Sequence, residues 1–86
     1  MARDKKLMEQ LMDYFNDNGV GMLASEIICD DVPTSKIVEH IELLMDRGYI
    51  KAVEVGWTGN QLNYRILRIT DTGYDFIDSV HEGFGQ

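Results

Sequence analysis

Residues 34–50 read TSKIVEHIELLMDRGYI and change from an amphipathic helical pattern to a strand-like pattern at Gly48. The helix is expected to begin at Thr34 or Ser35, either of which can cap it, and to end at Arg47 and Gly48. A glycine is needed there because the chain must turn sharply from helix into strand. The apolar side chains of this helix fall on one side of it and are expected to face a core: Ile37, Val38, Ile41, Leu44 and Met45.

The chain after this helix predicts a β-hairpin and then a last helix. Two segments rich in β-branched and aromatic residues, Tyr49–Trp57 and Leu62–Thr70, are joined by the turn-forming sequence Thr58-Gly59-Asn60-Gln61. The last helix is expected from about Asp71 to Glu82. Its acidic residues fall together on one side: Asp71, Asp75, Asp78 and Glu82.

The chain before residue 34 predicts two more helices. Leu7, Leu11 and Phe15 recur every four residues, which indicates a helix from about Arg3 to Asn16. Asn18 and Gly19 should end it, with Gly19 adopting a positive φ angle. A second, short helix is expected over Ala24–Cys29.

This order of elements predicts an α+β fold of the winged helix-turn-helix class. It comprises three helices, a two-stranded hairpin or wing, and a C-terminal helix. With 86 residues, the chain is expected to form a single winged-helix domain over 1–86.

Composition and charge narrow the possible functions. Apolar residues make up 44% of the chain, but no apolar run approaches the roughly 20 residues needed to span a bilayer. There is one cysteine, so no internal disulfide can form, and no signal peptide is recognised, which together favour the cytoplasm. The net charge is −7. Because phosphate backbones repel such a chain at long range, tight non-specific binding to nucleic acid is not expected.

Several short motifs support a resemblance to a known family. Arg47-Gly48-Tyr49-Ile50 and Ile69-Thr70-Asp71-Thr72-Gly73 look like the helix-to-wing and wing-to-helix junctions of bacterial winged-helix regulators. With Arg3-Asp4, the stretch 40–44 and the stretch 70–79, they resemble the domain-of-unknown-function family twenty-five thirteen over roughly residues 3–80. That family consists of short proteins common in phages and prophages.

The resemblance implies the fold and an origin in a mobile genetic element, but no mechanism. It also implies that the protein is located in the cytoplasm of a host cell. The tail departs from the family, since members often continue into a tryptophan-containing extension and this chain ends at 83–86.

No catalytic site is expected. The two histidines, His40 and His81, are far apart in sequence, and no Ser/His/Asp, Cys/His, HExxH, CxxC or Walker pattern is present. We therefore expect no enzyme activity, no cofactor and no metal. His40 is interpreted as a packed, hydrogen-bonded residue on the helix flank that braces the wing or the first helix.

The favoured function is binding of a protein partner, from the host or the phage. The outward side of residues 35–47 carries three carboxylates with an apolar residue beside them, and Trp57 near the wing tip suits an interface anchor or wing packing. Such a surface could steer the domain onto a basic partner and so modulate or inhibit a host nucleic-acid-handling or defence complex. A solvated helix face is the other interpretation. The predicted contact residues are Glu39, Glu42, Leu43, Asp46 and Trp57.

The alternative is a DNA-binding transcriptional regulator, for which a homodimer is possible. The third helix would enter the major groove and the wing would contact the backbone, although carboxylates near phosphates oppose this docking. Strand alternation predicts that Arg65 and Arg68 point to opposite faces and form no single patch. The residues expected to hold phosphates are Lys36, Arg47, Lys51, Arg65 and Arg68.

Overall fold

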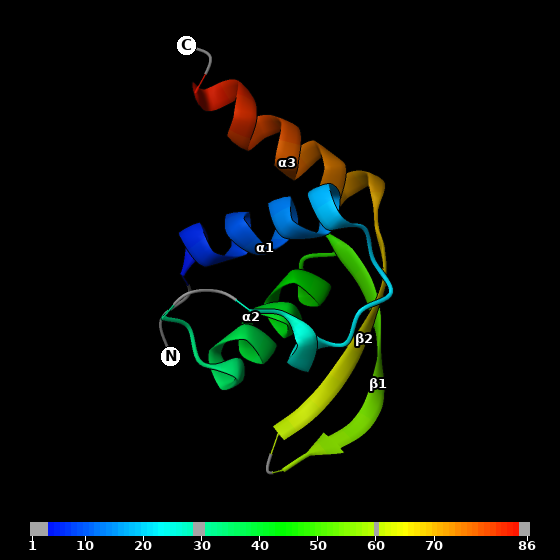
Figure 1. The fold of residues 1–86 in the computed structure, drawn as a ribbon. Coiled ribbons are helices and arrows are strands. Elements are labelled where there is room, and N and C mark those ends of the chain that lie inside the picture. The colour runs from blue at the N-terminus through cyan, green and yellow to red at the C-terminus, as the bar shows by residue number, and fades with distance from the viewer. Residues whose placement is uncertain (1–3, 29–30, 60, 85–86) are drawn as a thin grey trace.

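The structure, a computed structural model, describes residues 4–28, 31–59 and 61–84 and has an α+β fold (Figure 1). Helix α1 lies between α3 on one side and α2 on the other, and the hairpin of β1 and β2 extends beyond α2. In chain order the elements are α1 (Lys5–Asn18), the 3-10 turn η1 (Ala24–Glu26), α2 (Thr34–Asp46), β1 (Ile50–Thr58), β2 (Gln61–Ile69) and α3 (Asp71–Phe84).

The predicted order of elements is confirmed, with one element shorter than expected. The second helix was expected over Ala24–Cys29, but η1 ends at Glu26 because Ile27 is already extended, with φ −78° and ψ 127°. β-Branched residues favour extended backbone, and here Ile27 turns its side chain into the core, where only 2% of it is exposed. Cys29 lies outside the described residues.

Helix α1 is capped at both ends. The carboxylate of Asp4 accepts a 3.1 Å hydrogen bond from the backbone N–H of Leu7. At the other end Gly19 has φ 85°, as predicted, and its N–H donates to the carbonyl of Phe15. The helix therefore has a fixed start and a fixed stop.

Helix α2 begins at Thr34, as predicted, but its first turn is capped differently from the prediction. Pro33 occupies the N-cap position and no side chain caps the helix, so the expectation that Thr34 or Ser35 would do so is wrong. Both residues lie inside the first turn, and the carbonyl of Pro33 instead accepts hydrogen bonds from the N–H groups of Lys36 and Ile37. Here the extended backbone that proline favours sets where the helix starts.

The C-terminal end of α2 is a Schellman turn around Gly48. Gly48 has φ 75°, which confirms the need for glycine at this position. Its N–H donates to the carbonyl of Met45, and the N–H of Tyr49 donates to the carbonyl of Leu44. This turn directs the chain from α2 straight into β1.

The hairpin contains two bulges. The register pairs Lys51 with Arg68 and then Ala52 with Ile66, so Leu67 is an extra residue in β2. A second shift between Glu54 and Gly56 leaves an extra residue in β1. The first bulge allows both Ile66 and Ile69 to face the core, where they are 0% and 6% exposed.

The connector between α1 and η1 pairs with the other edge of β2. The N–H of Gly21 donates to the carbonyl of Ile66, and the N–H of Ile66 donates to the carbonyl of Met22. An antiparallel bridge between Leu23 and Arg65 continues this pairing. Thus β2 is flanked on both sides and joins the hairpin to the start of the chain.

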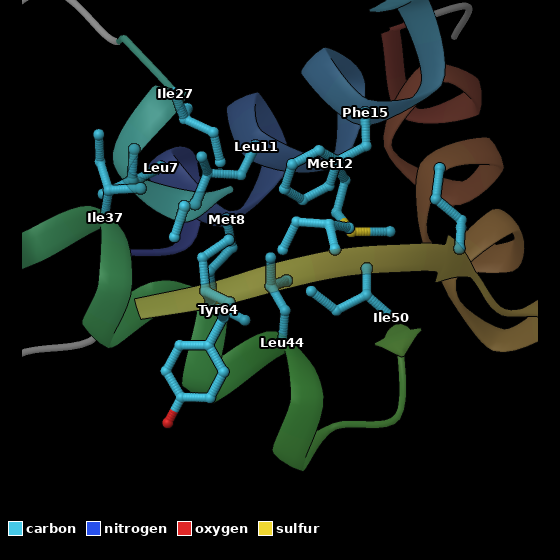
Figure 2. Close-up of a cluster of buried hydrophobic side chains, with 14 of the residues drawn as sticks. Leu7, Met8, Leu11, Met12, Phe15, Ile27, Ile37, Leu44, Ile50 and Tyr64 are labelled. Carbon is cyan, nitrogen blue, oxygen red and sulfur yellow. The ribbon is translucent and has the colours of Figure 1, made fainter. Parts of the chain in front are cut away.

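The core is built from α1, α2 and the inner face of the hairpin, and the predicted apolar stripes of both helices face it. Figure 2 shows these side chains packed around the strands, with the hydroxyl of Tyr64 pointing out of the cluster. Helix α3 adds Ile77, and half-buried Phe76 stacks on Tyr49 at a centroid distance of 4.6 Å. The side chains with no more than 1% exposure include Leu11, Met12, Phe15, Ile37, Val38, Ile41, Leu44 and Ile66.

The junction between β2 and α3 is tied to the junction between α2 and β1. The hydroxyl of Thr70 donates to the carbonyl of Gly48 and accepts a 3.0 Å hydrogen bond from the N–H of Gly73, so Thr70 caps α3. At Gly73 an added Cβ would lie 2.1 Å from the carbonyl oxygen of Tyr49. Only glycine lets the first turn of α3 approach that closely. Within the described ranges no helix is long and apolar enough to cross a membrane.

Candidate functional site

The outward face of α2 carries three carboxylates that form no ion pair within the part of the chain that the structure describes. Glu39 and Asp46 are exposed and Glu42 is half-buried. Among residues 4–28, 31–59 and 61–84, no lysine or arginine side chain forms an ion pair with any of these three groups. The predicted acidic surface on this helix is therefore present and not neutralised.

The hairpin contributes to the same surface through Tyr64. The Tyr64 hydroxyl donates a 2.6 Å hydrogen bond to Oε2 of Glu42, although the residue is only 5% exposed. This bond is the first cause that raises the pKa of Tyr64 from 10.0 to about 12, followed by burial and by the charges of Glu42, Glu54 and Asp46. Glu54 of β1 thus joins the carboxylates of α2, and we call Glu39, Glu42, Asp46 and Glu54 the acidic surface.

A pocket of about 270 Å³ opens within the acidic surface. It is lined by Glu42, Met45, Asp46 and Tyr64. Two carboxylates beside an aromatic ring and a thioether suit a long cationic side chain, whose apolar stem and charged end both find a matching group. Tyr64 and Glu54 were not predicted as site residues, because only the packing of the hairpin onto α2 brings them to this helix.

The two apolar members of the predicted protein-binding set differ in position. Leu43 is half-buried and packs against the core, so only part of its side chain is accessible. Trp57 is 71% exposed and pairs with Leu62 next to the hairpin turn. The indole therefore lies on the surface and contributes little to packing of the hairpin.

The fold already uses two of the five cations predicted to hold phosphates. Nζ of Lys36 lies 3.4 Å from Oδ2 of Asp4, which ties α2 to the start of α1. Nη1 of Arg65 donates a 2.8 Å hydrogen bond to the carbonyl of Gly21 in the connector. The other three cations are exposed: Arg47, Lys51 and Arg68.

The prediction that Arg65 and Arg68 point to opposite faces is wrong. Arg68 is paired with Lys51 and Arg65 with Val53, and Lys51 and Val53 are two residues apart on the unbulged part of β1. The extra residue Leu67 restores the alternation, so both arginines lie on the outer face. We call Lys51, Arg65 and Arg68 the basic strip; it lies on the face of the hairpin turned away from the core.

His40 holds the first helix to α2, which confirms its interpretation as a bracing residue. It is fully buried, and its Nε2 accepts a 3.0 Å hydrogen bond from the backbone N–H of Asp4. Its Nδ1 lies 2.8 Å from the carbonyl of Lys36. A neutral imidazole with its proton on Nδ1 satisfies both contacts. The side chain of His81 lies outside the described residues.

Among the residues that the structure describes, no group of three or more His, Cys, Asp or Glu side chains could hold a metal ion. A comparison of the chain with protein-family models, with curated proteins and with solved structures finds no match in any of the three.

Proposed function

We propose that this chain is a winged-helix accessory protein of the phage or prophage type that acts without catalysis by binding a basic protein partner through the acidic surface. The order of α2, Gly48 turn and hairpin supports the winged-helix assignment, as does the pairing of the connector with β2. In such a domain α2 is the helix that would meet a partner.

The observation that carries the proposal is that, in the described part of the chain, no lysine or arginine forms an ion pair with Glu39, Glu42 or Asp46. In a major groove these groups would approach phosphates and lose water without gaining a partner, which opposes binding. A protein surface rich in lysine and arginine is attracted to the same groups, and the attraction speeds association and selects the partner.

The partner we propose is a nucleic-acid-handling or defence protein of the host. Such proteins present basic surfaces to phosphate backbones, and the acidic surface offers the same sign of charge as the nucleic acid. Occupying that basic surface would block or modulate the host complex. The resemblance of residues 3–80 to short phage and prophage proteins is consistent with this role.

The test is affinity capture from lysate of the host cell, after nuclease treatment, with two variants of equal charge change. Glu39→Lys/Asp46→Lys reverses two exposed charges of the acidic surface, and Asp75→Lys/Asp78→Lys reverses two exposed charges on α3. The captured partner should be lost with the first variant and kept with the second. Equal capture by both variants, or equal loss, contradicts the assigned surface.

DNA binding is the second candidate, favoured by the basic strip. Lys51, Arg65 and Arg68 share one face, so they could contact one phosphate backbone together. A regulator of this kind should shift DNA fragments at low salt, and Lys51→Gln/Arg68→Gln should weaken the shift and its salt dependence. If no genomic fragment shifts at low salt, this candidate is eliminated.

A further inference from the structure

A second pocket lies on a different part of the molecule from the acidic surface. It has a volume of about 220 Å³ and is lined by Lys5, Met8, Arg47, Tyr49 and Phe76. These residues come from the start of α1, from the turn between α2 and β1, and from α3. Three elements that are distant in sequence thus converge on one cavity.

The walls of this pocket are apolar and aromatic. The rings of Tyr49 and Phe76 stack with their planes only 17° apart, so each ring fixes the position of the other, and both contribute to the wall of the pocket. Met8 is 3% exposed and supplies a deformable apolar wall. The close approach of Gly73 to the carbonyl of Tyr49 holds α3, and with it Phe76, against this side of the cavity.

Two cations complete the lining. Lys5 and Arg47 are both exposed, and no described carboxylate forms an ion pair with either of them. In a chain of net charge −7, two unneutralised cations beside one apolar cavity are an exception to the general charge pattern. A guanidinium and an ammonium group bind a carboxylate through charge-assisted hydrogen bonds.

From the apolar walls and the two cations of the lining together, we infer that this pocket binds an organic carboxylate with an apolar, preferably aromatic, body. The body would lie against Tyr49, Phe76 and Met8, and the carboxylate would face Lys5 and Arg47. The same chemistry occurs in a free small acid and in the C-terminal residue of a peptide. This site is independent of the proposed protein-binding function.

The first experiment is titration of the ¹⁵N-labelled full chain, followed by NMR, with three probes that share one ring. Benzoate should shift the amide signals of Met8, Tyr49 and Phe76 saturably, whereas neutral benzamide and cationic benzylammonium should bind at least about tenfold more weakly. Equal affinities for the three probes, or no saturable shift with benzoate in the millimolar range, would overturn the inference.

Matched variants locate the carboxylate. Lys5→Gln/Arg47→Gln should weaken benzoate binding about tenfold or more, because it removes both charge-assisted contacts. Lys51→Gln/Arg68→Gln makes the same charge change on the basic strip and should leave the affinity unchanged. All four positions are exposed, so both variants are expected to fold, which circular dichroism checks. Equal weakening in the two variants would show a general charge effect and reject the site.

Two further measurements complete the test. The first separates the contribution of the aromatic walls from that of charge, and the second distinguishes a free small acid from a peptide C-terminus as the ligand. Inorganic phosphate should not displace benzoate at equal concentration, since it cannot use the aromatic walls; displacement would overturn the role of the apolar body. N-acetylphenylalanine compared with its amide reports whether a peptide C-terminus fits. Tighter binding of N-acetylphenylalanine than benzoate assigns the site to a chain end, and the reverse assigns it to a free acid.

Discussion

The hydroxyl of Tyr64 and the carboxylate of Glu42 are joined by a 2.6 Å hydrogen bond that links β2 to the outward face of α2. This bond adds to the apolar packing of the hairpin on the helix, and both residues line the pocket of the acidic surface. It also makes the stability of the domain sensitive to alkaline pH, because the phenol must keep its proton to donate.

The first prediction concerns that pH dependence. The pKa of Tyr64 is raised in the folded state from 10.0 to about 12, so the folded protein holds this proton more tightly than the unfolded chain. The stabilisation is fully present below pH 10 and is lost as the pH rises from 10 toward 12. Tyr64→Phe should lower the free energy of unfolding by about 1–3 kcal/mol at neutral pH.

Urea unfolding of both proteins across the alkaline range provides the measurement. The difference in the free energy of unfolding between wild type and Tyr64→Phe should shrink as the pH rises above 10. Contributions from residues that the two proteins share cancel in this difference. A difference that stays constant with pH would show that the hydrogen bond to Glu42 does not control the proton.

The second prediction concerns His40. Replacing it by Leu removes the acceptor for the backbone N–H of Asp4 and the donor to the carbonyl of Lys36, inside the core. The free energy of unfolding should fall by about 1–3 kcal/mol because a half-buried amide is left without a partner. Hydrogen exchange at the amide of Asp4 should accelerate locally. Unchanged protection of that amide would refute the bracing role.

The third prediction concerns Gly73. A Cβ at this position would lie 2.1 Å from the carbonyl oxygen of Tyr49 and 2.8 Å from Cγ2 of Ile69. Gly73→Ala should therefore destabilise the fold by about 1–3 kcal/mol or more, although alanine stabilises an ordinary helix position. The melting temperature reports the change.

Gly59→Ala is a suitable comparison for Gly73→Ala. No atom lies within 4 Å of a Cβ added at Gly59, and the cost there comes only from the φ angle of +63°. Gly73→Ala should also separate α3 from the core, which hydrogen exchange in α3 would register. If Gly73→Ala raises the melting temperature, the close packing of α3 on Tyr49 is refuted.

The fourth prediction concerns Asp4. Its pKa is lowered from the ordinary value of 3.8, first by the hydrogen bond from the N–H of Leu7 and further by Lys36. A lowered pKa stabilises the folded state above the unfolded value, and this stabilisation is lost as the pH falls below 3.8. Asp4→Ala should thus destabilise the protein at neutral pH, and the difference from wild type should vanish in acid. A difference that persists in acid would contradict the capping role.

Local patterns were sufficient to predict most of the fold. The apolar spacing of α1 and α2, the turn sequence of the hairpin, and the glycines Gly19 and Gly48 depend on residues close together in the chain, and the structure confirms each of them. The negative charge of the outward face of α2 could also be predicted, because the periodicity of a single helix determines which side chains share a face.

The features that were missed depend on packing between distant segments. The bond between Tyr64 and Glu42 and the close approach at Gly73 arise only when two elements meet. A helical wheel or a strand alternation holds no information on such contacts.

Because of the bulge at Leu67, the number of residues in β2 determines on which face of the hairpin its charged side chains lie. Deleting Leu67 would restore regular alternation of side chains along β2. The side chains on one side of the deletion would then move to the opposite face of the strand, so that either Arg65 or Arg68 would point toward the core. Point substitutions leave this orientation intact, whereas a one-residue insertion or deletion in β2 reverses it. Among related chains, the length of β2 should therefore predict which of its side chains lie on the outer face better than its amino-acid composition does.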